Sequence, residues 1–156
     1  MNRLAIVAAA CITLAGCAHQ PLRPATDPRR PVALSTSLER YGGPSIKLVL
    51  LPDGTLRHSV NENDWLEASG TVVRKVTVTA AKWQQFRRDL DAAQVWSWKD
   101  DYPHPPGTSE GVIWKVHLAY PDRSITTQGE QTTPPPEQFR AYEAAVKKLI
   151  GNLPFE

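Results

Sequence analysis

Apolar and polar residues alternate in several stretches of the chain, which is the period of a strand with one buried face. The pattern is clearest over 112–120, where every second residue is apolar: Val112, Trp114, Val116, Leu118 and Tyr120. Shorter stretches either share this period or are rich in Val and Thr, which favour strands. Together they predict five strands, at 46–50, 56–60, 71–79, 112–120 and 124–128.

Turn signals separate these stretches. Tyr41-Gly42-Gly43-Pro44 precedes the first strand, Pro52-Asp53-Gly54 follows it, and Pro121-Asp122-Arg123 separates the last two. Short turns of this kind join antiparallel neighbours, so we expect hairpins at these points. The fifth strand is short and polar, and we expect it to lie at an edge of the sheet.

Two other stretches have apolar residues at helical spacing. The first runs from Ala80 to about Ala93 behind Thr79, which can cap it. The second starts at Thr133, has prolines in its first turn and ends at Gly151. Their predicted buried faces are formed by Trp83, Phe86, Leu90 and Ala93, and by Phe139, Tyr142, Val146 and Leu149.

The predicted order of elements is therefore βββαββα. Strands joined by short turns imply an antiparallel sheet, and an amphipathic helix must bury its apolar face against another element. We expect an α+β fold with a sheet of about five strands and two helices packed on one of its faces.

Residues 1–17 have the composition of a secretory signal. Arg3 is followed by an apolar run from Leu4 to Leu14 and then by small residues. The run is shorter than the roughly 20 apolar residues that a membrane-crossing helix needs. We therefore expect the segment to direct export and then to be removed.

The end of this segment, Leu14-Ala15-Gly16-Cys17, resembles the lipobox of bacterial lipoproteins. The resemblance implies that Cys17 is lipidated and becomes the first residue of the mature protein. Two or more acyl chains hold a protein stably on a membrane without spanning it. In that family Asp after the cysteine retains many members in the inner membrane, and Ala18 here implies the outer membrane, on its periplasmic face. An ordinary signal with an incidental cysteine is the alternative.

The rest of the chain divides into a Pro- and Arg-rich linker over 18–33 and one α+β domain over 34–156. The chain contains two cysteines. Because Cys11 lies in the signal and Cys17 carries the lipid, we expect no disulfide. The formal net charge of +2 argues against a dedicated nucleic-acid binder.

A second resemblance covers the layout of the domain. Ser37-Leu38-Glu39-Arg40, a turn, an alternating strand and Pro52-Asp53-Gly54-Thr55 are followed by a helix and a Trp-rich stretch. This layout is similar to small bacterial domains of unknown function that are often found in lipoproteins. Those domains commonly carry paired cysteines where this chain has Tyr41-Gly42-Gly43-Pro44. The resemblance implies the fold and no site.

The stretch 99–110 is rich in proline and holds the best candidates for metal or acid–base chemistry: Asp100, Asp101, Tyr102, His104 and Glu110. Their spacing matches no known metal-ligand pattern. The chain also lacks a nucleophile-elbow or phosphate-loop signature. We therefore expect a solvated loop, with no catalytic residues, no metal and no cofactor.

Tryptophan is unusually frequent, with five residues. Trp83 and Trp114 fit core positions, whereas the pattern does not assign Trp65, Trp96 and Trp98. These three either pack against a helix end or, with Tyr102 and His104, form an exposed binding patch, because tryptophan is enriched at binding hot spots. We take Trp65, Trp96, Trp98, Tyr102 and His104 as the candidate binding residues.

These features favour a non-enzymatic, membrane-anchored module that binds another envelope protein through its loops or an edge strand, as inhibitors and immunity proteins do. The alternative is a module that binds peptidoglycan or another glycan, because flat aromatic rings stack on sugars. An enzyme would require the 99–110 stretch to face a pocket with a second polar cluster.

Replacing Cys17 tests the anchor. Cys17→Ser is expected to leave the domain folded and to abolish membrane attachment, because the acyl chains have no other site. Fractionation of cells into soluble and membrane parts measures this, with Cys11→Ser as the matched control that stays attached. Retention of Cys17→Ser in the membrane fraction would contradict lipid anchoring at this residue.

Overall fold

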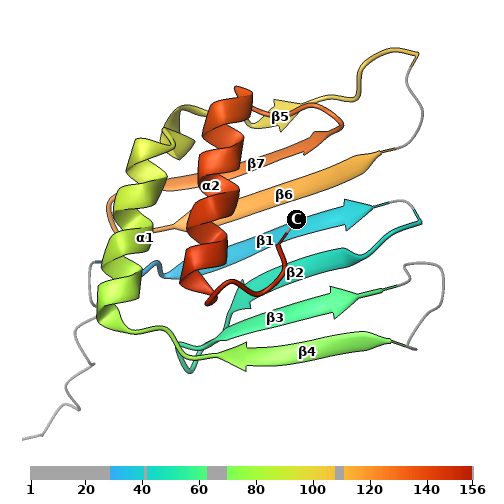
Figure 1. Ribbon diagram of the computed structural model, residues 1–156. Coiled ribbons are helices and arrows are strands. Elements are labelled where there is room, and N and C mark those ends of the chain that lie inside the picture. Colours follow the sequence, from blue (N-terminus) through green and yellow to red (C-terminus); the bar gives the residue numbers. More distant parts are fainter. Residues whose placement is uncertain (1–28, 41, 63–69, 108–110, 156) are drawn as a thin grey trace, which may run out of the picture.

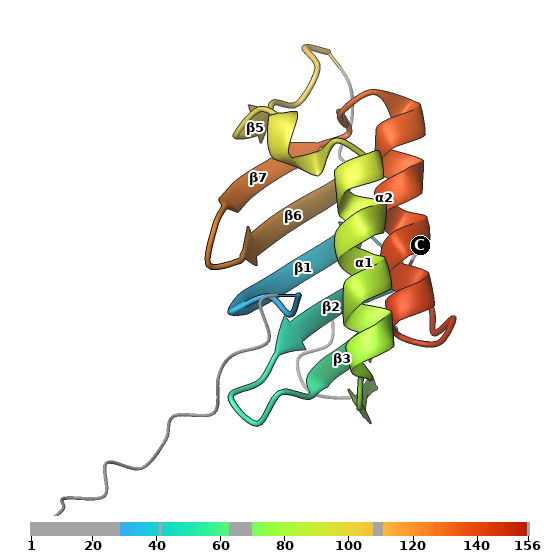
Figure 2. The ribbon, with the colours of Figure 1, turned by 90° about the vertical axis from the view of Figure 1, so that its left-hand side faces the viewer.

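The computed structural model describes residues 29–40, 42–62, 70–107 and 111–155, and every structural statement below refers to them. One seven-stranded sheet carries two α-helices on one of its faces (Figures 1 and 2). The elements are β1 (Ala33–Arg40), β2 (Ser45–Leu50), β3 (Leu56–Asn61), β4 (Thr71–Val76), α1 (Ala80–Ala92), the 3₁₀ helix η1 (Val95–Ser97), β5 (Asp101–Tyr102), β6 (Val112–Ala119), β7 (Ser124–Glu130) and α2 (Pro136–Leu149). The predicted α+β class with two helices on one side is confirmed.

The strands lie in the order β4-β3-β2-β1-β6-β7-β5. Every neighbouring pair is antiparallel except β5 and β7, which are parallel. The helices cover the middle of one face, and the opposite face has no helix over it in the described part of the chain (Figure 2). The alternation of β6 follows from this arrangement, because Trp114, Val116 and Leu118 are buried under the helices while Lys115 and His117 are exposed on the open face.

The predictions of about five strands and of the order βββαββα are wrong. The first strand that the sequence pattern did not predict is β1, which lies at the centre of the sheet between β2 and β6. Its helix-facing positions are Leu34, Thr36 and Leu38, so a polar residue interrupts the apolar alternation. Thr36 is tolerated there because the buried Tyr142 hydroxyl of α2 donates a hydrogen bond of 2.8 Å to its Oγ1. Residues 31–33, predicted as linker, already contact the sheet: Pro31 is buried and the Val32 amide bonds the Ala119 carbonyl.

The second missing strand is β5, whose two residues are too few to show a period. It pairs outside β7, so β7 is not the outermost strand as predicted, and β7 extends to Glu130. The start of the predicted solvated loop is therefore part of the sheet. Asp101 lies opposite Gln128 and Tyr102 opposite Gly129.

The helix predictions are largely confirmed. Thr79 caps α1, because its Oγ1 accepts a hydrogen bond of 3.3 Å from the Lys82 amide. All eight residues predicted to form the buried helix faces are buried. Helix α2 begins at Pro136 and not at Thr133, and β4 ends at Val76 and not at 79. The turn after β2 forms as predicted, with the Gly54 amide bonded to the Leu51 carbonyl at 2.9 Å.

Trp114 is the largest fully buried side chain and anchors α2's leading loop to the sheet. Its Nε1 donates a hydrogen bond of 2.8 Å to the Thr132 carbonyl. The ring lies directly over Gly129 of β7, where a Cβ atom would come within 2.7 Å of the ring and 2.5 Å of the Thr132 oxygen. A glycine is therefore needed at this strand position for steric reasons.

The helices among the described residues are all too short or too polar to cross a membrane.

Candidate functional site

Four of the five predicted binding residues come from one segment between α1 and β6, and the structure places that segment at the β7 side of the sheet (Figure 2). Trp96, Trp98, Tyr102 and His104 all lie there. The two remaining site predictions, Cys17 and Trp65, lie outside the described residues, as does Glu110.

An open hollow of about 750 Å³ lies beside β7. We call it the edge hollow, because it extends from the open face of the sheet around the outer edge of β7 to the segment that follows α1. Among the residues that line it are Trp96, Trp98, Asp100, Lys115, His117 and Thr126. It therefore joins polar side chains of the open face to two tryptophans on the helix side.

A second hollow of about 420 Å³ adjoins it and contains Tyr102 and His104. The two hollows share Asp101, Lys115 and Gln128, so four of the predicted binding residues border one continuous surface. His104 Nδ1 lies 3.4 Å from Glu130 Oε1 of β7. The sequence could supply the residues of this surface but not their convergence, since it depends on the position of β5 beside β7.

Trp98 contributes little of its ring to this surface, because it is only 6% exposed. The ring packs against the rings of Trp114, Phe139 and Tyr142, with centroid distances of 6.2, 6.0 and 5.5 Å. Its Nε1 donates a hydrogen bond of 3.0 Å to Gln138 Oε1 of α2. Of the two interpretations of Trp98, packing against a helix is the one that its contacts support.

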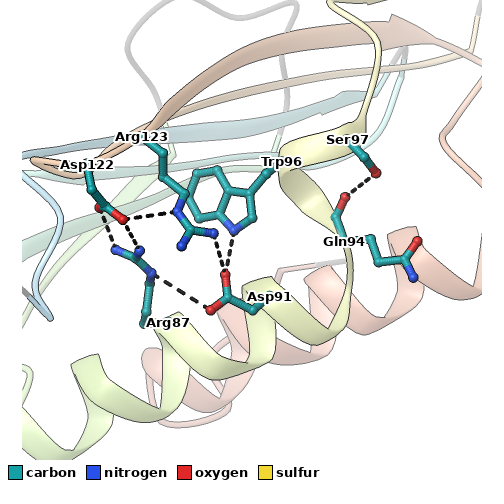
Figure 3. A network of polar contacts seen from close by, with 7 residues as sticks. All are labelled: Arg87, Asp91, Gln94, Trp96, Ser97, Asp122 and Arg123. Carbon is teal, nitrogen blue, oxygen red and sulfur yellow. Dashed lines mark hydrogen bonds and ion pairs between the residues drawn. The ribbon is translucent and has the colours of Figure 1, made fainter.

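Trp96 is half-buried and held from several sides (Figure 3). Its Nε1 donates a hydrogen bond of 2.7 Å to Asp91 Oδ1, and its ring meets Tyr120 edge-on at 5.8 Å. The guanidinium carbons of Arg123 and Arg87 lie 5.1 and 5.7 Å from the ring centroid, within cation–π range. Trp96 is thus a fixed wall of the edge hollow. The flat face of its ring already contacts the guanidinium groups of Arg87 and Arg123.

The charged groups around Trp96 tie three elements together (Figure 3). Arg87 of α1 forms two hydrogen bonds to Asp122 in the β6–β7 turn, at 3.2 and 2.7 Å. Arg123 reaches back from that turn to Asp91 at 3.0 Å. Paired hydrogen bonds between guanidinium and carboxylate are directional, so they fix the turn relative to the helix. Sequence reasoning identified only a turn at Asp122, because its partner on α1, Arg87, lies more than thirty positions away.

The network and the burial around it shift the pKa values of two groups, Asp122 and Tyr120. The Arg87 guanidinium lowers the pKa of Asp122 from its ordinary 3.8 to about 2. Burial raises the pKa of Tyr120, whose ring lies 4.3 Å from the Arg87 guanidinium carbon. Tyr120 therefore acts as a neutral ring at any physiological pH.

The outer edge of β7 is only partly paired. The Tyr120 amide bonds the Arg123 carbonyl, and antiparallel strands alternate, so the odd-numbered residues of β7 bond β6 and the even-numbered ones point outward. The outward Gln128 amide confirms this by bonding the Asp100 carbonyl at 3.1 Å. In the described part of the chain, no backbone group bonds the outward side of Ser124 or Thr126. We call these two residues the open edge.

The polar residues do not form a recognisable catalytic arrangement. His117 Nδ1 lies 2.9 Å from Thr126 Oγ1, but both side chains are exposed and no described carboxylate orients the other ring nitrogen. The described ranges also contain no group of three or more His, Cys, Asp or Glu side chains that could hold a metal ion. Asp100 and His104 each line a hollow that contains Lys115. The described residues around these hollows do not, however, pair a nucleophile with a base.

No model of a known protein family matches the chain, and no curated protein matches it at a significant level.

The Arg87–Asp122 pair predicts a pH dependence of stability. Because the pKa of Asp122 is lowered in the folded state, its contribution is present above the ordinary value of 3.8 and is lost as the pH falls toward 2. Asp122→Asn is expected to have a lower thermal midpoint than the unchanged protein at pH 7. Between pH 5 and pH 2, the midpoint of the variant is expected to fall less than that of the unchanged protein. Circular dichroism measures both midpoints. Asp100→Asn is the matched control, because no described group pairs with the Asp100 carboxylate. Identical behaviour of the two variants would show that the pair does not stabilise the turn.

Proposed function

We propose that this chain is a non-enzymatic, lipid-anchored module of the bacterial envelope that binds another protein at the edge hollow, as an inhibitor or immunity protein does. The observation that carries the proposal is the edge hollow itself, an open space of about 750 Å³ beside a partly unpaired strand. Protein-binding sites often combine a fixed aromatic wall with unsatisfied polar groups.

The walls of the edge hollow are held rigidly, which supports a binding role. Trp96 is fixed by Asp91 and by two guanidinium groups, and Trp98 is locked by its bond to Gln138. A wall that does not reorganise loses little conformational entropy on binding. Apart from Asp100, which precedes β5, the remaining polar residues of the hollow lie on strands, which position them more firmly than loops would.

The glycan alternative receives less support from the same residues. Stacking on a sugar needs a free, flat aromatic face. Trp98 is 6% exposed, and the ring of Trp96 has guanidinium groups against it. The exposed groups of the hollow include Asp100, Lys115 and His117, which suit the side chains and backbone of a protein.

The location remains part of the proposal. It depends on the lipobox-like Leu14-Ala15-Gly16-Cys17 and on Ala18, which favour the periplasmic face of the outer membrane. A domain held there by the part of the linker that precedes Pro31 would reach partners near the membrane. No disulfide or cofactor is needed for this role.

Site-specific photo-cross-linking in living cells tests the proposal. p-Benzoylphenylalanine replaces Ser124 or His117, both of which line the edge hollow, or Gln84, which is exposed on α1. Irradiation is expected to give a discrete adduct with one envelope protein at the first two positions and none at Gln84. Mass spectrometry of the adduct identifies the partner and the contacting peptide. Adducts of equal yield at all three positions, or none at the hollow, would contradict a binding site there.

A further inference from the structure

We infer that the partner binds by strand addition: an extended segment carrying a basic residue pairs with the open edge of β7 and continues the line of β5. The inference rests on the proposed function and names the form in which the partner is recognised.

The backbone of the open edge offers a ready hydrogen-bonding pattern. Ser124 and Thr126 each direct an N–H and a C=O away from β6, and in the described ranges neither group has a protein partner. An extended peptide placed alongside could satisfy all four. Exposed strand edges of this kind are the sites at which added strands gain most of their affinity from main-chain bonds.

The same edge already accepts a strand a few residues further on. β5 pairs with β7 at Gln128 and Gly129, and the Thr127 hydroxyl bonds the Lys99 carbonyl at 2.7 Å. Before Lys99 the chain leaves this line, because Trp98 is buried against α2, and η1 packs on α1 and near β7 without a backbone hydrogen bond to Ser124 or Thr126. The line that β5 occupies is thus left open next to Ser124 and Thr126.

The side chains around this line indicate which segment would fit. Successive residues of an added strand point alternately to the two faces of the sheet. One set would face Lys115 and His117 on the open face, and the other would face Trp96. The Asp100 carboxylate at the end next to β5 is exposed and has no partner in the described ranges, whereas Lys115 is paired with Glu39 at 3.5 Å. Among the Asp and Lys residues that line the edge hollow, the charge left without an ion-pair partner is therefore negative, which favours a lysine or arginine in the segment.

The opposite edge of the sheet is a poorer template. β4 is six residues long and exposes Val72 and Val73, but it also carries Arg74 and Lys75. Charged side chains on an edge strand discourage pairing with another chain. Only the β7 edge, among the described strands, combines unpaired backbone groups with a hollow bordered by fixed aromatic walls.

The probe for the test is a phage-displayed library of linear ten-residue peptides, selected on the full chain in detergent. The enriched peptide is expected to contain a basic residue, and its Kd is measured by fluorescence anisotropy. Thr126→Pro removes one outward amide and is expected to weaken binding at least about tenfold, since each tenfold step corresponds to about one good hydrogen bond. Thr126→Ala keeps that amide while losing the hydroxyl bond to His117, and is expected to stay within about threefold.

Two further measurements distinguish a lost hydrogen bond from misfolding of the variant and from binding that does not involve a paired strand. Ser124→Pro removes the second outward amide and is expected to weaken binding similarly, and thermal midpoints show whether each variant folds. An N-methyl scan of the peptide should weaken binding at every second residue, the period of a paired strand. Failure to enrich any peptide, unchanged binding by both folded proline variants, or an N-methyl pattern without this period would overturn strand addition. A specific photo-adduct at Ser124 together with any of these results would leave the protein-binding function standing.

Discussion

The burial of Trp98 under α2 is the interaction on which the geometry of the site depends. Its indole packs with Trp114 of β6 and with Phe139 and Tyr142 of α2, and its N–H is bound by Gln138. Burying an aromatic ring of this size contributes on the order of a few kcal/mol. The chain after α1 is therefore drawn toward the helix layer, and its backbone first bonds β7 through the carbonyls of Lys99 and Asp100. The open edge of β7 is a consequence of that path.

A second constraint fixes the other side of the hollow. The pairs Arg87–Asp122 and Arg123–Asp91 join α1 to the β6–β7 turn (Figure 3). Both guanidinium groups lie against the ring of Trp96, and that of Arg87 also lies over Tyr120. Individual exposed ion pairs stabilise a protein little, but bidentate geometry and a shared network make the arrangement directional. The open edge thus begins at a turn whose position is set, and it ends where β5 pairs.

Periodicity predicted the fold class, both helices and the strands with regular alternation, because burial on one face leaves a direct trace in the sequence. β1 left a weaker trace, since its buried Thr36 depends on a hydroxyl of Tyr142 more than a hundred positions away. β5 left none, because two residues have no period. The candidate residues Trp96, Tyr102 and His104 were found by composition alone. Their convergence, the network of Arg87 and the unpaired side of Thr126 arise from long-range packing, which one sequence does not display. The predictions for Cys17 and Trp65 lie outside the described residues.

Amide hydrogen exchange of the free protein, followed residue by residue by NMR, shows whether the outward side of β7 is unpaired. Hydrogen-bonded amides of a central strand exchange slowly, whereas unpaired edge amides exchange readily. We expect slow exchange for the amides of Ile125 and Thr127, which bond β6, and exchange close to that of an unstructured peptide for those of Ser124 and Thr126. A Thr126 amide as protected as that of Thr127 would contradict an open edge on β7.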